Sequence, residues 1–415
     1  MKEKNFISPA KIFRKSGLSF LFGFFLALFF KNYFNFIPIP FSLIFGSLFF
    51  ILCFSLFDLC SFKKYSFLLF IFFLFGFLRP FLNFSLTLPF YPLLLDFSLK
   101  IKNFLEEKLS IFFNSFQKEF LMSLFFGARN HLSYPLKEKI QKVGLSHIVA
   151  VSGFHLSFLN KGLSFLFYEL FALNKYLNFF LIIIFDFLFV LCSNFSPSVI
   201  RSFSMAFLVL LASLNYRFYY PTNALIFTLC LMIFLNPEIF FDIGFQLSFL
   251  ATFSLLYFYP LLEKLVILKD KDNSLLWEDD SNFFKNLFQK FKNSFFQIFL
   301  LNFSALIFTA PLVLYYFSSF SFLSPVTNML ILPIIPLIMG LSVFFFIFSS
   351  FSFYFSLFFA SFLKILINYC FLVIDFFSTM NWANFSFPSN LRFFFLVFYP
   401  LLFLFFYFLK NKIKV

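Results

Sequence analysis

The stretch LNFFLIIIFDFLFVLCS, residues 177–193, carries one formally charged side chain, Asp186, in seventeen residues. A helix of this length rises about 25 Å, which is most of the roughly 30 Å hydrocarbon core of a bilayer. Similar runs recur along the 415 residues, of which 61% are hydrophobic and 12% are charged. A soluble domain has about 25% charged residues. The composition therefore predicts a polytopic membrane protein and excludes a soluble or disordered chain.

Apolar runs bounded by charge or proline predict about ten to twelve transmembrane helices. All are expected to be α-helices, because the alternation of a membrane β-barrel is absent. Prolines inside apolar runs, in Thr309-Ala310-Pro311 and at Pro333 and Pro336, predict kinked or broken helices. The predicted spans are 18–35, 37–57, 65–79, 145–170, 177–193, 198–215, 221–235, 240–262, 294–317, 323–348, 351–376 and 391–409.

The net charge of +14 is concentrated at a few places along the chain. Both termini are basic, which by the positive-inside rule predicts that both are cytoplasmic. Residues 80–144 are then expected on the external side of the membrane. Apolar residues at helical spacing over 93–125 predict an amphipathic helix lying on the membrane.

A basic cluster follows in this external segment, with Arg129, Lys137, Lys139 and Lys142 against Glu138. Such a cluster suits an interfacial helix on anionic lipid. It equally suits a collector for a polyanion that arrives from outside. The sequence leaves both interpretations open.

Several polar residues lie inside predicted spans, where they are costly and usually face the bundle interior or a water path. His147 and His155 share a face of a straight helix, where both could be hydrogen-bonded inside the bundle. A break at Ser152-Gly153 would instead line a wet cavity with backbone groups. Asp186 and Arg201 lie at similar depths on consecutive spans, which predicts a structural ion pair and leaves a pathway role for Arg201 open.

A polar stripe is predicted where the next span begins. Glu238, Asp242 and Gln246 recur every four residues. On one helix these side chains would face other helices or water.

The chemistry of common enzymes is missing from the sequence. No phosphate-binding G-x-x-x-x-G-K-[ST] loop and no G-x-S-x-G elbow occur, and the chain has three histidines and no C-x-x-C pair. The sequence therefore predicts no enzymatic activity, no metal and no cofactor.

Three blocks together resemble the signature of the ComEC competence family. The first joins Gly127-Ala128-Arg129 to GLSHIVAVSGFH at 144–155, the second is SPSVIR at 196–201, and the third is GFQLSFLA at 244–251. Pro311 to Tyr315 and Asn328 to Pro333 lie where later blocks fall.

The resemblance implies a channel that passes transforming single-stranded DNA across the bacterial cytoplasmic membrane. A periplasmic DNA-binding protein would deliver the DNA and a cytoplasmic ATPase would pull it. The basic cluster would form the external entrance of the channel. The residues that match the family blocks and would line the DNA path are His147, Ser152, Gly153, His155, Arg201 and Gln246.

The implied organisation has four parts: N-terminal helices 1–80, a reduced external segment 81–125 in place of an OB-like domain, a channel domain 126–350, and C-terminal helices with a basic tail 351–415. We expect a short form without the metallo-β-lactamase-like domain of larger members. The alternatives are a secondary transporter of a small anion or lipid that uses Asp186, Glu238 and Asp242, and a hydrolase that uses Ser152 with His155.

Overall fold

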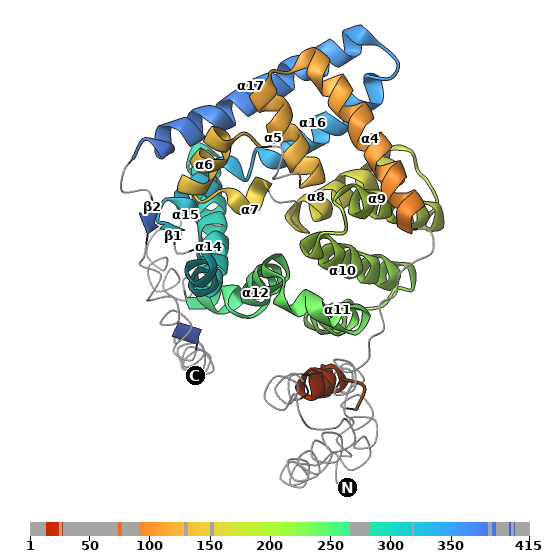
Figure 1. The fold of residues 1–415 in the computed structure, drawn as a ribbon, viewed down its shortest axis with the longest axis vertical. Helices are drawn as coiled ribbons and strands as arrows, with labels where there is room; N and C mark the ends of the chain where they lie inside the picture. Colours follow the sequence, from red (N-terminus) through yellow and green to blue (C-terminus); the bar gives the residue numbers. More distant parts are fainter. Residues whose placement is uncertain are drawn as a thin grey trace, which may run out of the picture. The chain divides into compact units, whose positions relative to one another are not determined.

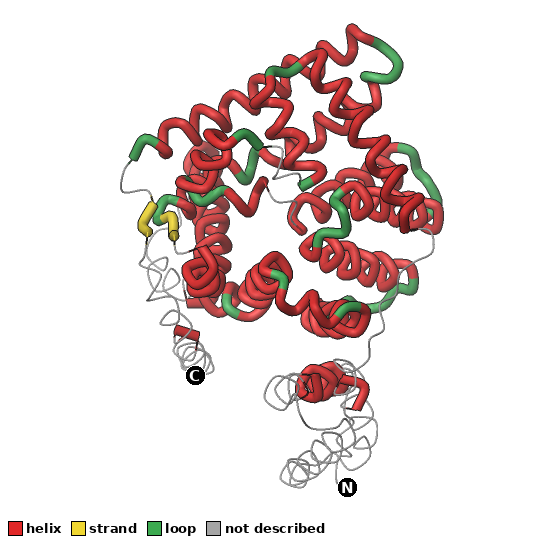
Figure 2. Tube along the Cα trace, in the orientation of Figure 1, coloured by secondary structure: helices red, strands yellow, loops and turns green. Residues whose placement is uncertain are grey.

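The computed structural model describes residues 14–24, 27, 74–76, 91–127, 132–149, 153–265, 283–317, 319–380, 384–386, 398, 399 and 402. These residues are almost entirely helical, with one two-stranded antiparallel sheet (Figures 1 and 2). In chain order the elements are α4 (Tyr91–Phe112), α5 (Ser115–Phe126), α6 (Tyr134–Lys142), α7 (Ser146–Val149), α8 (Gly153–Ser164), the π-helix η4 (Phe165–Leu170), α9 (Lys175–Cys192), α10 (Pro197–Leu214), α11 (Pro221–Leu235), the 3₁₀-helix η5 (Pro237–Phe241), α12 (Ile243–Tyr257), α14 (Phe283–Phe317), β1 (Ser319–Ser321), α15 (Ser324–Ile331), α16 (Ile335–Phe348), α17 (Phe353–Ser378) and β2 (Asn384–Ser386).

Five of these helical stretches are long and apolar enough to cross a membrane. They are Lys175–Cys192, Pro197–Leu214, Ile243–Leu265, Phe296–Phe317 and Phe353–Ser378. The prediction of an all-α polytopic membrane protein is confirmed. The total of ten to twelve spans stays a prediction, because the expected span 37–57 and most of 18–35, 65–79 and 391–409 lie outside the described residues.

Proline breaks one span and leaves another continuous. α15 and α16 meet at an angle of 42° across a short break that contains Pro333, as a broken span or re-entrant loop does. Pro311, in contrast, lies inside the uninterrupted helix α14. The break predicted around Pro333 is therefore confirmed, whereas the helix does not stop at Pro311.

Contacts divide the chain into two units. One comprises residues 1–89 and 208–242, and the other comprises 90–207 and 243–415. In the first unit, Cys230 Sγ on α11 lies 3.5 Å from the carbonyl oxygen of Gly17, and a Cβ on Gly17 would overlap the side chain of Ile226. This close approach of two segments explains a glycine at position 17.

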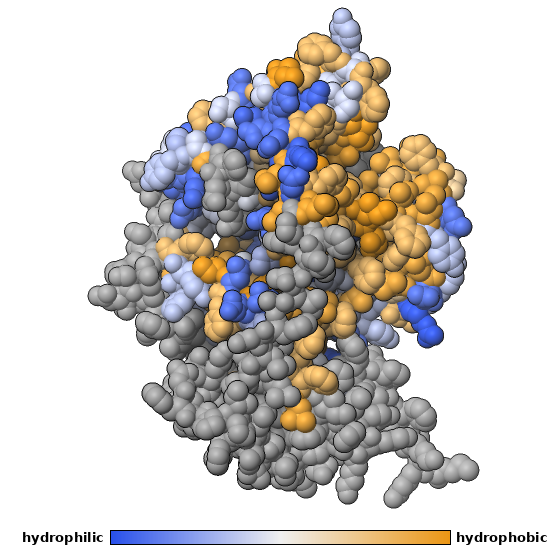
Figure 3. All heavy atoms as spheres, turned by 45° about the vertical axis from the view of Figure 1, so that its right-hand side comes forward, coloured by the Kyte–Doolittle hydropathy of each residue, from blue (hydrophilic) through white to orange (hydrophobic). Residues whose placement is uncertain are grey.

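The core of the second unit is built by α5, α16 and α17. Leu121, Leu124, Met339, Leu363 and Ile367 are fully buried there. The opposite face of α17 exposes Phe358, Phe362, Ile365 and Leu372, as a lipid-facing surface requires. Figure 3 shows apolar side chains over much of the described surface, with polar side chains gathered in separate patches.

The single surface helix predicted over 93–125 is wrong in its second half. The chain breaks at Phe113 and Asn114, where Asn114 and Gln117 form a capping box that starts α5. From Phe120 to Phe126 every residue of α5 is buried. The apolar spacing predicted helix correctly, but the second half of α5, FLMSLFF, is apolar on all sides apart from Ser123, which is typical of a buried helix.

The polar stripe predicted over Glu238, Asp242 and Gln246 is also wrong. η5 carries Glu238, Asp242 has an extended backbone at its end, and α12 begins at Ile243. Because the chain leaves the helical conformation at Asp242, a spacing of four residues no longer places the three side chains on one face.

Candidate functional site

Gly153 is held in a tight contact at the first residue of α8. A Cβ at this position would overlap Ser202 Oγ and lie 2.6 Å from Arg201 Nη2, both on α10. A side chain at position 153 would displace Ser202 and Arg201 from their present positions, so glycine lets α8 begin this close to α10. The first and second sequence blocks therefore meet here.

Arg201 continues this junction into α12. It is 9% exposed, and its Nε donates a 2.7 Å hydrogen bond to Ser248 Oγ. Its Nη2 donates to Ser202 Oγ at 3.2 Å, and its guanidinium carbon lies 6.0 Å from the ring centroid of Phe249. Ser248 and Phe249 belong to the third block, so all three blocks converge on one buried cation.

The third block also reaches α14. Tyr316 Oη donates a 3.1 Å hydrogen bond to the side-chain oxygen of Gln246. One helical turn on, Thr252 Oγ1 donates to the Ser248 carbonyl, and Ser254 Oγ donates to the Ser304 carbonyl. Two polar contacts, Tyr316 to Gln246 and Ser254 to Ser304, thus cross the α12–α14 interface, where hydroxyl groups favour close helix packing.

The turn that precedes α7 is fastened to the broken helix α15. Gly144 has φ +76°, and a Cβ there would lie 2.6 Å from Ser324 Cβ. Ser324 Oγ donates to the Gly144 carbonyl at 3.3 Å, and Thr327 Oγ1 donates to the Val143 carbonyl at 2.9 Å. Two features therefore favour glycine at position 144: its left-handed backbone conformation and the close approach of α15.

The two histidines of this block have different surroundings. His147 on α7 is exposed, and His155 on α8 is 1% exposed. α7 ends at Val149 and α8 begins at Gly153, and the residues between them, including Ser152, lie outside the described residues. Of these two histidines, only His155 has a buried side chain.

The predicted ion pair between Asp186 and Arg201 is not formed in this structure. Asp186 on α9 is fully buried, and its Oδ2 accepts a 2.8 Å hydrogen bond from Asn160 Nδ2 on α8. Arg201 instead donates to the hydroxyls on α10 and α12. Equal depth on consecutive helices was the basis of the prediction, but depth does not fix which way each side chain points.

The lysines of the basic cluster lie on α6, which is anchored by the buried side chains of Leu136 and Ile140. Lys139 pairs with Asp375 of α17 at 2.7 Å, and Lys142 pairs with Glu138 one turn away at 2.8 Å. Lys137 is exposed, and no ion pair within the described part of the chain includes it. Arg129 lies outside the described residues.

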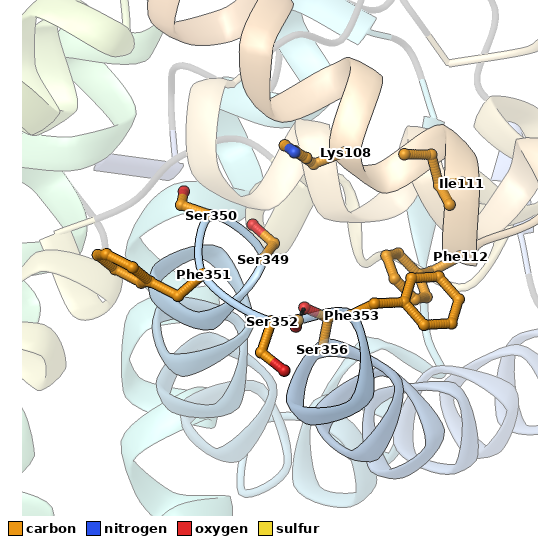
Figure 4. A pocket seen from close by; sticks show the side chains of 9 residues that line it. All are labelled: Lys108, Ile111, Phe112, Ser349, Ser350, Phe351, Ser352, Phe353 and Ser356. Atoms are coloured by element: carbon orange, nitrogen blue, oxygen red, sulfur yellow. Dashed lines mark hydrogen bonds between the residues drawn. The ribbon is translucent and has the colours of Figure 1, made fainter.

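A pocket of about 250 Å³ lies apart from these blocks, between the end of α4 and the turn that joins α16 to α17 (Figure 4). Lys108 of α4 faces Ser349 and Ser350 across it, and Phe353 closes one side. None of the predicted site residues lines this pocket.

Sequence reasoning missed the residues that connect the blocks. Ser248, Ser202, Tyr316 and Thr327 were not singled out, although each donates or accepts a hydrogen bond at the junctions. The available signal was the presence of small hydroxyl residues inside apolar spans, where they favour helix–helix contacts. Among the described residues, no group of three or more His, Cys, Asp or Glu side chains is arranged to hold a metal ion.

Comparison with known proteins identifies the family of the chain. The Competence protein family is matched over residues 124–412, well over half of the chain. The chain belongs to this competence protein family. The convergence on Arg201 therefore concerns residues that lie within the matched region of the family.

A curated relative agrees with the family assignment. The chain is 27% identical over 213 residues to "ComE operon protein 3" of Bacillus subtilis (strain 168). That alignment covers 51% of this chain and 24% of the relative, so the chain spans about a quarter of the relative's length. No solved structure matches the chain.

Proposed function

We propose that this competence protein forms the path by which transforming single-stranded DNA crosses the bacterial cytoplasmic membrane. The membership of the competence family supports a role in competence DNA uptake. Within the described part, the observation that carries the proposal is the junction where Gly153, Arg201 and Ser248 bring three sequence blocks from different helices together.

A DNA strand inside a membrane needs a path lined by polar groups, because its phosphates cannot lose water without replacement contacts. Arg201 supplies a cation held in place by two hydroxyls, and Gln246 and Tyr316 supply neutral hydrogen-bonding groups on the next interface. Contacts of this kind are insensitive to base sequence, as a conduit for arbitrary DNA requires.

In this proposal the protein conducts and does not catalyse. Both termini face the cytoplasm, where an ATPase pulls the strand, and a periplasmic DNA-binding protein supplies it. Lys137 and the other α6 lysines lie on the outer side, where they attract DNA electrostatically.

The test is a deletion strain that is fed fluorescent double-stranded DNA. We expect label to accumulate outside the cytoplasmic membrane and transformants to be lost, and plasmid-borne wild-type protein to restore both. Normal transformation in the deletion strain would overturn the proposal. It would favour the alternative of a secondary transporter, for which the buried carboxyl of Asp186 is the first residue to test.

A further inference from the structure

Asp186 and Asn160 share one hydrogen bond, and one oxygen of each side chain lacks a partner. Asn160 Nδ2 donates to Asp186 Oδ2 at 2.8 Å. The other oxygen of each group, Asp186 Oδ1 and Asn160 Oδ1, is buried and has no hydrogen-bond partner. Both remaining atoms are acceptors, so the described surroundings lack one hydrogen.

A single proton on Asp186 would supply the missing hydrogen. A carboxylic acid pairs with a primary amide through two parallel hydrogen bonds, one in each direction. If Asp186 carries the proton on Oδ1, its O–H donates to Asn160 Oδ1 while the existing N–H···O bond closes the ring. An ionised carboxylate at this fully buried position would instead cost several kcal/mol without a cation beside it.

We propose that Asp186 is an intramembrane proton-binding site, in which the protonated carboxyl pairs with the Asn160 amide and joins α8 to α9. The proposal is independent of DNA passage, since it concerns the state of one carboxyl group. It matters for the site because Asn160 lies on the helix that begins at Gly153, so the pair fixes the helix that packs against Arg201.

Charged and titratable groups on the elements packed against α9 offer no competing partner for Asp186. On α4 and α5, Lys100 pairs with Asp96 and Lys118 pairs with Glu106. Burial lowers the pKa of Lys102, and its nearest electrostatic partner is Cys192. The other titratable or charged groups on α4, α5, α8, η4, α9 and α10 whose side chains the structure describes form no ion pair with Asp186; they are Glu107, Lys108, Glu119, His155, Lys161, Glu169, Lys175, Tyr168, Tyr176 and Arg201.

A bound metal ion is a poorer explanation of the two oxygens. A hard cation takes about six oxygen ligands, and this site has two unpartnered side-chain oxygens. A trapped water would need two to four polar partners and would leave the carboxylate charge in place. The proton accounts for both orphan atoms and the charge together.

The experiment is infrared spectroscopy of the full-length protein in lipid nanodiscs at neutral pH. We expect wild type to show a protonated-carboxyl C=O band that shifts in heavy water and is lost in Asp186→Asn. Asp375→Asn is the matched control, because that carboxylate is half-exposed and paired with Lys139. It should leave the band unchanged.

A second variant guards against misfolding of the first. Asn160→Ala keeps Asp186 but removes its partner, so the band should move to higher frequency as the hydrogen bond is lost. If Asp186→Asn removes only carboxylate bands, the proton is absent and the proposal fails. If Asn160→Ala leaves the band where it was, the acid–amide pair is overturned.

Discussion

Two regions of this protein carry positive charge that the sequence predicts to meet DNA, and they differ in how that charge is held. Arg201 is 9% exposed, lies against Gly153, and donates to side chains on α10 and α12. The side chains of Lys139 and Lys142 are 48% and 45% exposed and pair with carboxylates. A buried cation depends on every neighbour, whereas an exposed pair is worth only about 0.2–1 kcal/mol.

The largest effect is expected at the glycine of the buried junction. Gly153→Ala adds a Cβ that overlaps Ser202 Oγ and approaches Arg201. Overpacking costs about 1–3 kcal/mol, and each 1.4 kcal/mol is about tenfold in an equilibrium. We therefore expect transformation frequency to fall about ten- to hundredfold at equal protein level.

Gly162→Ala is the matched control on the same helix. A Cβ there meets nothing within 4 Å, so transformation should be unchanged. Equal defects in both variants would show that α8 tolerates no substitution at all, and the special role of the Arg201 contact would be lost.

A smaller effect is expected where α7 meets α15. Gly144→Ala forces a side chain into a left-handed backbone at a cost of about 1–2 kcal/mol and pushes against Ser324. We expect a lower thermal unfolding temperature in detergent and reduced transformation. Gly340→Ala on α16, which has open space, should change neither. An unaffected Gly144→Ala protein would show that the turn is not fastened to α15.

The hydrogen bond between Arg201 and Ser248 should contribute no more than either glycine. Ser248→Ala leaves the buried Nε donor without its 2.7 Å acceptor, while the guanidinium keeps its bonds to Met205 and Ser202. The cost should therefore lie at the lower end for a bond to a charged group, about 1.5 kcal/mol. Transformation should fall severalfold to tenfold, measured against Ser361→Ala, an exposed serine that bonds its own helix. A result equal to the control would remove Ser248 from the junction.

The smallest effect belongs to the exposed lysines. Lys139→Glu places two negative side chains where Lys139 now pairs with Asp375. The double variant Lys139→Glu with Asp375→Lys reverses the pair and should restore the wild-type transformation frequency. Transformation should change less than about fivefold in the single variant, since surface pairs contribute about 0.2–1 kcal/mol. A defect larger than that of Gly153→Ala would reverse the ranking of the two regions.

The sequence predicted helices well because apolar length is a direct consequence of the bilayer. The expected spans 177–193, 198–215 and 351–376 correspond to Lys175–Cys192, Pro197–Leu214 and Phe353–Ser378. It failed where the surroundings of a helix matter. The second half of α5 is buried and not on a surface, and Asp242 interrupts the helix that would have aligned three polar residues.

The site was predicted as residues but not as contacts. Arg201 and Gly153 were singled out separately, and the structure joins them. Asp186 was assigned to Arg201, whereas the structure pairs it with Asn160, which no sequence pattern singles out. Side-chain partners across helices depend on helix rotation, which hydropathy does not determine.

The most direct test of the DNA path is photo-crosslinking during uptake. Phe249 lies 6.0 Å from Arg201 at the junction, whereas Phe362 is 48% exposed on the lipid-facing side of α17. Each is replaced in turn by p-benzoylphenylalanine, and cells taking up labelled DNA are irradiated. The proposal predicts a covalent adduct with single-stranded DNA at position 249 and none at position 362. An adduct at neither position, or equally at both, would contradict a path through this junction.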